Sequence, residues 1–366
     1  MENDKKSNYL GNPNLKKSNV NVQYTKKQMA EYIKCAGDPI YFFKKYIKIV
    51  NVDRGLIPFK PYGFQEDIVE LASKERFVIC KMPRQSGKTT TIAALLLWYV
   101  LFNESYSVAI LANKMQQSRE ILGRIQLAYE HLPKWLQQGV LEWNKGNLEL
   151  ENGSKILASA TSSSAVRGGS FNLVYLDEFA FVSPNIQEEF FSSVYPTISS
   201  GKTSKVLITS TPNGLDMFYR IWSDSERKKN SYKRVEVNWW DVPGRDDKFK
   251  EQTIANTSEE QWRVEFECEF LGSQLTLIDP NFLRQMYPDR PLSMNEKTAI
   301  YKEPEPNRIY VMTCDVARGV NRDYSAVSVL DVTEVPYSLV ARFKANDVTV
   351  QYFPTIIYEL GKKYNE

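Results

Sequence analysis

The segment that most constrains this chain is residues 77–102, where an apolar run, a short loop and a second apolar run follow one another directly. The loop, RQSGKTT, contains GKT at residues 87–89, as a phosphate-binding loop does. The usual pattern, G-x-x-x-x-G-K-[ST], would place its first glycine at position 82. This chain has Met82 there, followed by Pro83, which has no backbone N–H. The question is whether the GKT belongs to a working nucleotide site or arose by chance.

The context of the loop favours a working site. A phosphate-binding loop follows a β-strand and opens an α-helix, because backbone amides at the helix start bind the phosphates. Residues 77–81 (FVICK) are typical of a buried strand, and residues 89–102 of an apolar helix. Gly87 would let the backbone approach a phosphate, Lys88 would reach the β- and γ-phosphates, and the Thr89 hydroxyl would bind Mg²⁺. The same predicted ATP site includes the neighbouring residues Gln85, Ser86 and Thr90.

A second signal is the acidic pair in NLVYLDEFAF. Asp177 and Glu178 end an apolar strand, and in an open α/β sheet the ligand lies outside the carboxyl ends of the strands. Asp177 would hold Mg²⁺ through water, and Glu178 would polarise the attacking water as general base. Acidic pairs are also frequent at solvated strand ends. Placed about ninety residues beyond a GKT, this pair fits ATP hydrolysis better.

Residues on either side of the first core strand extend the predicted site. Arg84, inside the loop, would neutralise charge beside the γ-phosphate as an arginine finger supplied in cis, or it is an ordinary surface arginine. The ring of Tyr62 or Phe64 would stack on adenine while the Gln65 amide pairs with the N6 and N7 edge. An ordinary helix start is the alternative interpretation of those three residues.

The sequence ITSTPNG, residues 208–214, follows another apolar strand. Ser210, Thr211 and Asn213 would lie near the γ-phosphate and could sense its loss. The alternative is a turn that is rich in capping residues.

The order of elements predicts the fold class. Strand-like and helix-like segments alternate from residue 77 to about residue 240, which predicts an α/β fold with a mostly parallel sheet and helices on both faces. Residues 258–271 are expected to be helical, and 366 residues are enough for two domains. The expected organisation is a flexible N-terminal arm (1–24), an ATPase domain with a helical subdomain (25–271), a linker or hinge (272–307) and a second domain (308–366).

Composition excludes several other classes of protein. The chain has one histidine, His131, and four cysteines that are far apart in the sequence, so zinc sites and disulfides are not expected. No apolar run reaches the length of a membrane span, and the N-terminus lacks the apolar core of a signal peptide. The net charge of +3 argues neither for nor against nucleic acid, so any basic surface must be local.

The set of motifs resembles the large terminase subunit of tailed bacteriophages, the ATP-driven DNA packaging motor, and within it the myophage type. The resemblance runs from about residue 9 to residue 366. It is carried by RQSGKTT, LEWNKGNLELENGS, SSSAVRGGSF, VYLDEFAF and ITSTPNG. That family tolerates a Walker A loop that lacks its first glycine, so Met82 is no objection to a nucleotide site.

The resemblance implies a fold, a set of roles and a set of partners. The fold is a P-loop NTPase of the ASCE, RecA-like type, followed by an RNase H-like nuclease domain. The implied ATPase roles are Lys88 and Thr89 for phosphate and Mg²⁺, Arg84 as catalytic arginine, Asp177 as Walker B acid, Glu178 for catalysis, Gln65 for adenine, and Ser210 with Thr211 for coupling. The implied partners are double-stranded DNA, the portal protein, a small terminase subunit and further copies in a ring. Such a motor works in the host cytoplasm during assembly, needs no membrane and is not part of the mature virion.

Residues 309–366 resemble the beginning of the nuclease domain. Asp315 ends the first strand and Asp323 opens the second, and such nucleases use two divalent metal ions held by several carboxylates. The strand that should carry the next catalytic acid would come after Glu366, and Arg318 stands where some relatives have another acid. We therefore expect an incomplete nuclease domain that does not cleave DNA alone.

Two other functions remain open at this stage. A helicase-like translocase would separate DNA strands and would need a second RecA-like domain. A nucleotide-gated binding protein would bind ATP without releasing phosphate. DNA contacts are expected to be independent of sequence, because a motor grips phosphates. The candidate contacts, which would otherwise form a solvated charged face, are Arg227, Lys228, Lys229, Lys233 and Arg234.

Overall fold

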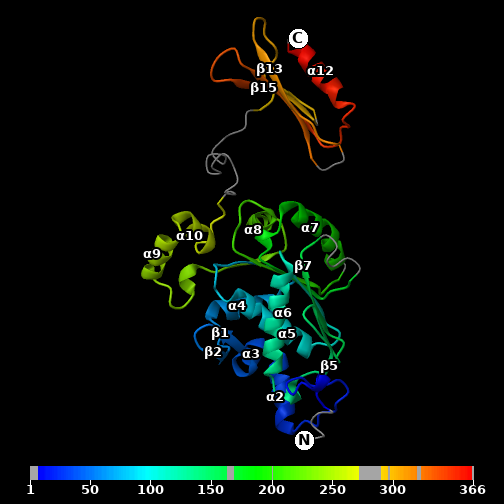
Figure 1. Cartoon of the computed structure of the whole chain (residues 1–366), viewed down its shortest axis with the longest axis vertical. Helices are drawn as coiled ribbons and strands as arrows, with labels where there is room; N and C mark the ends of the chain where they lie inside the picture. The colour runs from blue at the N-terminus through cyan, green and yellow to red at the C-terminus, as the bar shows by residue number, and fades with distance from the viewer. Residues whose placement is uncertain are drawn as a thin grey trace. The chain divides into compact units, whose positions relative to one another are not determined.

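The computed structural model of the chain divides into two compact units, Met1–Pro280 and Asn281–Glu366 (Figure 1). It describes residues 7–162, 169–199, 201–271, 290–295, 297–319 and 323–364. The first half of the segment expected to be a linker, residues 272–289, lies outside the described residues, as do residues 1–6 of the expected arm.

The first unit is built on an eight-stranded sheet with the order β10-β3-β9-β8-β4-β7-β6-β5. The six strands from β10 to β7 are parallel, whereas β6 runs antiparallel to both of its neighbours. The strands are β3 (Phe77–Lys81), β4 (Ser107–Ala112), β5 (Val140–Trp143), β6 (Asn147–Leu150), β7 (Lys155–Ala160), β8 (Leu173–Asp177), β9 (Lys205–Ser210) and β10 (Lys233–Glu236).

Helices cover both faces of this sheet (Figure 1). Val78 and Cys80 of β3 pack with α4, α5 and α6 in one apolar core, whereas Phe77 and Ile79 pack with α7 and α8 in another. The alternation follows from the period of two in a strand, and it explains why β3, β4 and β8 are buried on both sides. The helices are α2 (Lys26–Gly37), α3 (Pro39–Tyr46), α4 (Gly63–Lys74), α5 (Lys88–Phe102), α6 (Met115–Glu130), α7 (Pro184–Ser199), α8 (Met217–Glu226), α9 (Asp247–Asn256) and α10 (Glu259–Glu265).

The strand order confirms the predicted mostly parallel α/β fold. β9 lies between β3, which leads into the phosphate-binding loop, and β8, which ends at Asp177. This additional strand between the two motif-bearing strands is what the ASCE type of P-loop NTPase implies. The carboxyl ends of all three strands meet at one edge of the sheet, since they are parallel.

Three segments differ from the sequence-based expectations. Residues 7–24 pack on the first unit instead of extending freely, because Leu15 is buried and Lys16 pairs with Glu151 at 2.9 Å. The hairpin of β1 (Lys48–Asn51) and β2 (Gly55–Pro58) had not been predicted. The helix expected over residues 258–271 is only α10, which ends at Glu265, and Cys268 beyond it has a left-handed φ of 54° that is not helical.

The second unit has a five-stranded antiparallel sheet with the order β11-β12-β15-β14-β13. Helix α12 (Phe353–Lys363) packs on it through Phe353 and Leu360, which meet Val327 and Phe343 of the sheet. The strands are β11 (Ser293–Met294), β12 (Thr298–Ile300), β13 (Tyr310–Asp315), β14 (Ser325–Asp331) and β15 (Ser338–Ala345). Two of them, β11 and β12, form from residues that had been expected to belong to the linker.

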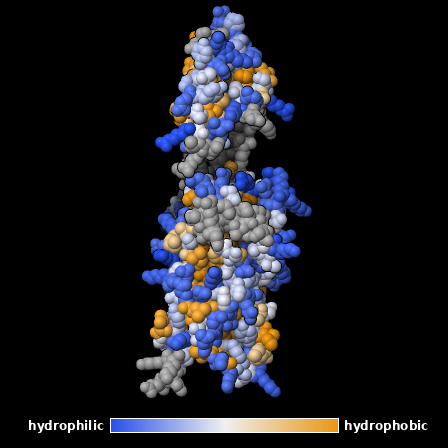
Figure 2. Space-filling view, turned by 90° about the vertical axis from the view of Figure 1, so that its right-hand side faces the viewer, coloured by the Kyte–Doolittle hydropathy of each residue, from blue (hydrophilic) through white to orange (hydrophobic). Residues whose placement is uncertain are grey.

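In the view of Figure 2, the surface is mostly hydrophilic, with hydrophobic residues in small groups. Within the described parts of the chain, no helix combines the length and the apolar character that crossing a bilayer requires.

Candidate nucleotide site

Met82, which stands at the position of the usual first glycine, still makes a hydrogen bond to the central sheet. Met82 is fully buried, and its backbone N–H donates to the carbonyl oxygen of Ser210 at 3.1 Å, so it still pairs with β9. Gln85 and Gly87 then adopt left-handed φ values of 56° and 77°, and α5 begins at Lys88. The N–H at the position of the usual first glycine is therefore occupied by a hydrogen bond to β9, whereas the amides at the start of α5 remain available to a phosphate.

Gly87 is required by the space around it as well as by its backbone conformation. A Cβ atom at this position would lie 2.5 Å from Nε2 of Gln65. Gln65 is buried, its Nε2 donates to the carbonyl oxygen of Ser86 at 3.1 Å, and its Oε1 accepts from the N–H of Tyr62 at 2.9 Å. Gln65 therefore supports the loop with both ends of its amide, and its predicted contact with adenine stays a prediction.

The aromatic residues ahead of Gln65 lie at the start of α4, where Tyr62 is the N-cap and Phe64 is in the first turn. The rings of Tyr62 and Phe64 are 5.7 Å apart, and Tyr62 is 41% exposed. An exposed ring at this position is accessible to a base, so the predicted stacking on adenine remains a prediction with a suitable surface.

Lys88 and Glu178 face each other across the site. Their side chains form an ion pair, and the Lys88 ammonium is buried. Glu178 directly follows β8 and has a left-handed φ of 48°, a conformation that costs free energy in a residue other than glycine. Its Oε2 lies 3.4 Å from both the Ser210 hydroxyl and the Thr211 N–H, so residues at the end of β9 hold the predicted general base.

Asp177 is buried beside this pair and is held by two hydroxyl groups. Its Oδ1 accepts from the Tyr175 hydroxyl at 2.6 Å and from the Thr209 hydroxyl at 3.0 Å. Burial raises the pKa of Asp177, and the charge of Glu178 raises it further. Binding a cation would offset this penalty, because a nearby positive charge favours the ionised carboxylate.

Tyr175 and Thr209 were missed in the sequence, although two signals point to them. Tyr175 precedes Asp177 by two residues and therefore lies on the same face of β8. Thr209 is the register partner of Asp177 on β9, a relationship that requires the strand order. The first signal was available in the sequence, whereas the second was not.

Side chains at the site fit a nucleotide with Mg²⁺. The Ser86 hydroxyl is buried and has no hydrogen-bond partner among the residues that the structure describes. Lys88 brings a buried positive charge, Thr89 lies in the first turn of α5, and Asp177 contributes a carboxylate. A phosphate would supply the missing acceptor for Ser86, and Thr89 with Asp177 would hold the metal ion.

Arg84 points toward α10 in this structure. Its side chain is 60% exposed, and its Nη1 lies 3.0 Å from the Glu265 carboxylate. Its backbone N–H also donates to the Glu265 carbonyl oxygen at 2.8 Å. The structure thus connects Arg84 to the end of α10, and its predicted role as an arginine finger remains a prediction.

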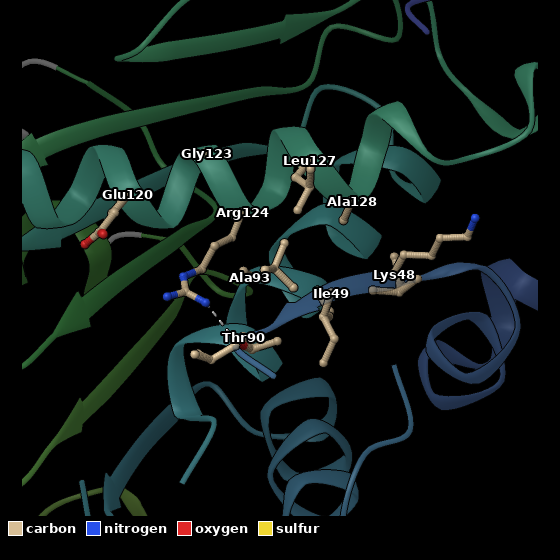
Figure 3. Close-up of a pocket in the computed structure, with 13 residues that line it drawn as sticks. Lys48, Ile49, Thr90, Ala93, Glu120, Gly123, Arg124, Leu127 and Ala128 are labelled. Atoms are coloured by element: carbon tan, nitrogen blue, oxygen red, sulfur yellow. Dashed lines mark hydrogen bonds between the residues drawn. The ribbon is translucent and has the colours of Figure 1, made fainter. Parts of the chain in front are cut away.

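Thr90 lines a different cavity from the rest of the predicted site. A pocket of about 530 Å³ lies between β1, α5 and α6, with Thr90 and Arg124 on its walls (Figure 3). The Thr90 hydroxyl accepts from Nη1 of Arg124 at 3.3 Å. Because this side chain is engaged with α6, any contact between Thr90 and a nucleotide rests on its backbone N–H.

The predicted nuclease residues come together in the second unit. Asp315, at the end of β13, and Asp323, just before β14, line one pocket of about 620 Å³ with Arg318 and Tyr324. Within the described ranges, no group of three or more histidine, cysteine or acidic residues is arranged to hold a metal ion. The assignment of two divalent metals to this pocket stays a prediction.

The basic segment considered for DNA lies at one edge of the first sheet. Lys233 and Arg234 belong to β10, and Arg234 pairs with Glu226 at 2.9 Å. Lys229 and Lys233 are exposed. The segment therefore offers accessible positive charge, and its contact with DNA stays a prediction.

Comparison with known proteins identifies the family. The family model described as terminase large subunit, T4likevirus-type, N-terminal, matches residues 79–283, which is more than half of the chain. The chain is similar to tripartite terminase subunit 3 of human cytomegalovirus (strain Merlin), at 24% identity over 181 residues, covering 47% of this chain and 26% of that protein. The corresponding subunit of human herpesvirus 7 (strain JI) is 21% identical over 183 residues, covering 48% and 26%. The match thus spans about a quarter of the length of these relatives.

Solved structures show the same fold. The large terminase of bacteriophage HK97 has a TM-score of 0.58 at 17% identity, covering 84% of this chain and 67% of that one. A mutant ATPase domain of the Thermus phage P74-26 large terminase has a TM-score of 0.50 at 21% identity, covering 58% and 95%. With a matching family model and this shared fold, the chain belongs to the T4likevirus-type family of terminase large subunits.

Proposed function

We propose that this chain hydrolyses ATP and uses the free energy to move double-stranded viral DNA into an empty capsid. The observation that carries the proposal is the arrangement at the carboxyl ends of β3, β8 and β9. There Lys88 pairs with Glu178, and Glu178 lies against Ser210 and Thr211. ATP-driven motion needs a lysine for the phosphates and a general base for the attacking water. It also needs a polar strand end that contacts this general base.

In the proposed reaction the chain's own residues bind, orient and move a proton. The amides at the start of α5 and the Lys88 ammonium bind the phosphate chain, and Thr89 with Asp177 hold Mg²⁺, which neutralises charge on the phosphates. The Glu178 carboxylate accepts a proton from the attacking water, and Arg84 approaches the γ-phosphate after leaving Glu265. Ser210 and Thr211 then sense the change at Glu178, because both contact its Oε2.

The proposal extends to partners that follow from family membership. We propose contacts with DNA phosphates, with the portal of the capsid, with a small terminase subunit and with further copies in a ring, all in the host cytoplasm during assembly. A role of the second unit in DNA cleavage would use Asp315 and Asp323 with two divalent metal ions.

The direct test is phosphate release by the purified chain with Mg²⁺ and ATP, with and without double-stranded DNA of two unrelated sequences. We expect hydrolysis that both DNAs stimulate equally, because the contacts are to phosphates. Tight ATP binding without phosphate release would favour a nucleotide-gated binding protein instead. Strand displacement would favour a helicase, although the second unit, with its antiparallel sheet, does not resemble a second RecA-like domain.

Tyr175→Phe is expected to raise the Mg²⁺ concentration needed for half-maximal hydrolysis about tenfold, because outer hydrogen bonds to a metal ligand orient it. At saturating Mg²⁺, kcat is expected to stay within a few-fold of the unmodified protein. The measurement is a Mg²⁺ titration of phosphate release. Tyr129→Phe is the matched control, since it also removes a buried hydroxyl, one that donates to the carbonyl oxygen of Gln138. An equal Mg²⁺ requirement in both variants would contradict the positioning role of Tyr175.

A further inference from the structure

Arg245 holds the phosphate-binding loop from outside the sheet. It lies between the short helix η4 (Trp239–Asp241) and α9. Its Nη2 donates to the carbonyl oxygens of Arg84 and Gln85, at 2.7 and 3.1 Å. These two residues immediately precede Ser86, so the guanidinium is anchored next to the amides that a phosphate would contact.

The second terminal nitrogen of Arg245, Nη1, does not take part in these contacts with the loop. Nη1 is buried and has no hydrogen-bond partner in the described part of the chain, where no carboxylate pairs with Arg245 either. An arginine keeps its charge in a protein, although burial lowers the pKa of Arg245. A buried, charged N–H without an acceptor costs free energy, and native structures normally supply such a group with a partner.

The surroundings of Arg245 hold the guanidinium in place and offer no strong acceptor of their own. The rings of Phe249 and Phe266 lie 5.2 and 5.4 Å from it. Besides burial, the groups that influence the pKa of Arg245 are Cys268 and Tyr62, and burial raises the pKa of the Cys268 thiol to about 12, so that this thiol is neutral. None of these neighbours supplies an anionic acceptor to Nη1, which leaves this N–H available to a bound ligand.

We propose that Nη1 of Arg245 donates to the phosphate chain of the nucleotide bound at the loop. This inference rests on the proposed function and adds a nucleotide-binding residue that lies outside the sequence motifs. The segment of residues 239–271 is then connected to the loop by Arg245 and Glu265, and to the ligand by Arg245. Binding of ATP fastens this segment, and loss of the nucleotide leaves it attached to the loop alone.

The alternative is that Arg245 only braces the loop, and two variants separate the possibilities. Arg245→Lys keeps the positive charge and one donor for the loop carbonyls but loses the second arm of the guanidinium. Glu265→Gln weakens the same loop-to-segment connection by removing the charge that pairs with Arg84, and it leaves Arg245 unchanged. The exposed Arg119→Lys on α6 is the control for the substitution itself.

The experiment measures the Kd of a fluorescent ATP analogue by titration, and the Kd values of ATP, pyrophosphate and adenosine by competition. We expect Arg245→Lys to raise the Kd values of ATP and pyrophosphate about tenfold or more, because one charge-assisted hydrogen bond is lost. The Kd of adenosine is expected to stay unchanged. The ATP Kd of Glu265→Gln is expected to stay within about threefold of that of the unmodified protein, and the ATP Kd of Arg119→Lys is expected to equal it.

Two results would overturn the inference while leaving the proposed function intact. One is an unchanged ATP Kd in Arg245→Lys, and the other is an equal loss in Arg245→Lys and Glu265→Gln, which would make Arg245 a brace only. If the unmodified protein binds neither ATP nor pyrophosphate, the proposed function fails together with this inference.

Discussion

Glu178→Gln is expected to lower the kcat of ATP hydrolysis at least about 100-fold while ATP binding is retained, because the amide cannot accept the proton of the attacking water. ATP affinity is expected to stay equal or to increase, since the ion pair between Glu178 and Lys88 is lost and the ammonium is freed for phosphate. Single-turnover phosphate release measures the first effect, and equilibrium binding of ATP measures the second.

The control for this variant is Glu188→Gln, which changes an exposed glutamate on α7. It should leave kcat unchanged. Hydrolysis by Glu178→Gln at the rate of the control would contradict the assignment of Glu178 as general base. A loss of ATP binding together with hydrolysis would mean that Glu178 chiefly holds the site together.

The second large effect is expected from Lys88→Ala. Removing the ammonium should weaken ATP binding about 10- to 100-fold and leave hydrolysis undetectable, because a charge-assisted contact to the phosphates is lost. The variant also leaves the Glu178 carboxylate without its ion-pair partner. The measurements are the Kd of ATP and the rate of phosphate release at saturating ATP.

Lys205→Met provides a matched comparison at the other end of the sheet. The Lys205 ammonium is also partly buried, and it donates to the carbonyl oxygens of Ala72, Ser73 and Glu75 at the amino end of β9. Its loss should lower the melting temperature with no effect on the Kd of ATP. If Lys88→Ala and Lys205→Met bound ATP equally well, Lys88 would not be a phosphate ligand.

The central sheet could be predicted from the sequence because its strands are short, apolar and separated by helical periodicity. β3, β4 and β8 are buried along their whole length, and an apolar run is the direct consequence. The hairpin of β1 and β2 could not be predicted in this way, because its residues are partly exposed and carry no clear alternation. β10 is likewise exposed, and its pairing with β3 joins residues that are far apart in the chain.

Tertiary contacts determine the segments for which the local sequence pattern gave a wrong prediction. The helix predicted to reach residue 271 ends at Glu265, where Trp262 stacks on Phe266 at 4.7 Å and donates to Glu267 at 2.8 Å. At the site, the positions of Lys88, Asp177 and Ser210 were predictable because each lies at the end of an apolar strand or in the loop that follows one. Tyr175 and Thr209 act through hydrogen bonds to Asp177, and Arg245 reaches the loop from a segment far along the chain, so the strand order and the loop position had to be known first.

The position of β9 has a thermodynamic consequence. One short stretch at its carboxyl end contacts the start of the loop through the Ser210 carbonyl, Asp177 through Thr209, and the proposed general base Glu178 through Ser210 and Thr211. Any molecule that binds the residues after this stretch and shifts it must change the affinity for nucleotide. By linkage, the nucleotide changes the affinity for that molecule by the same factor. The affinity for nucleotide and the affinity for that molecule would then be linked by a single coupling free energy.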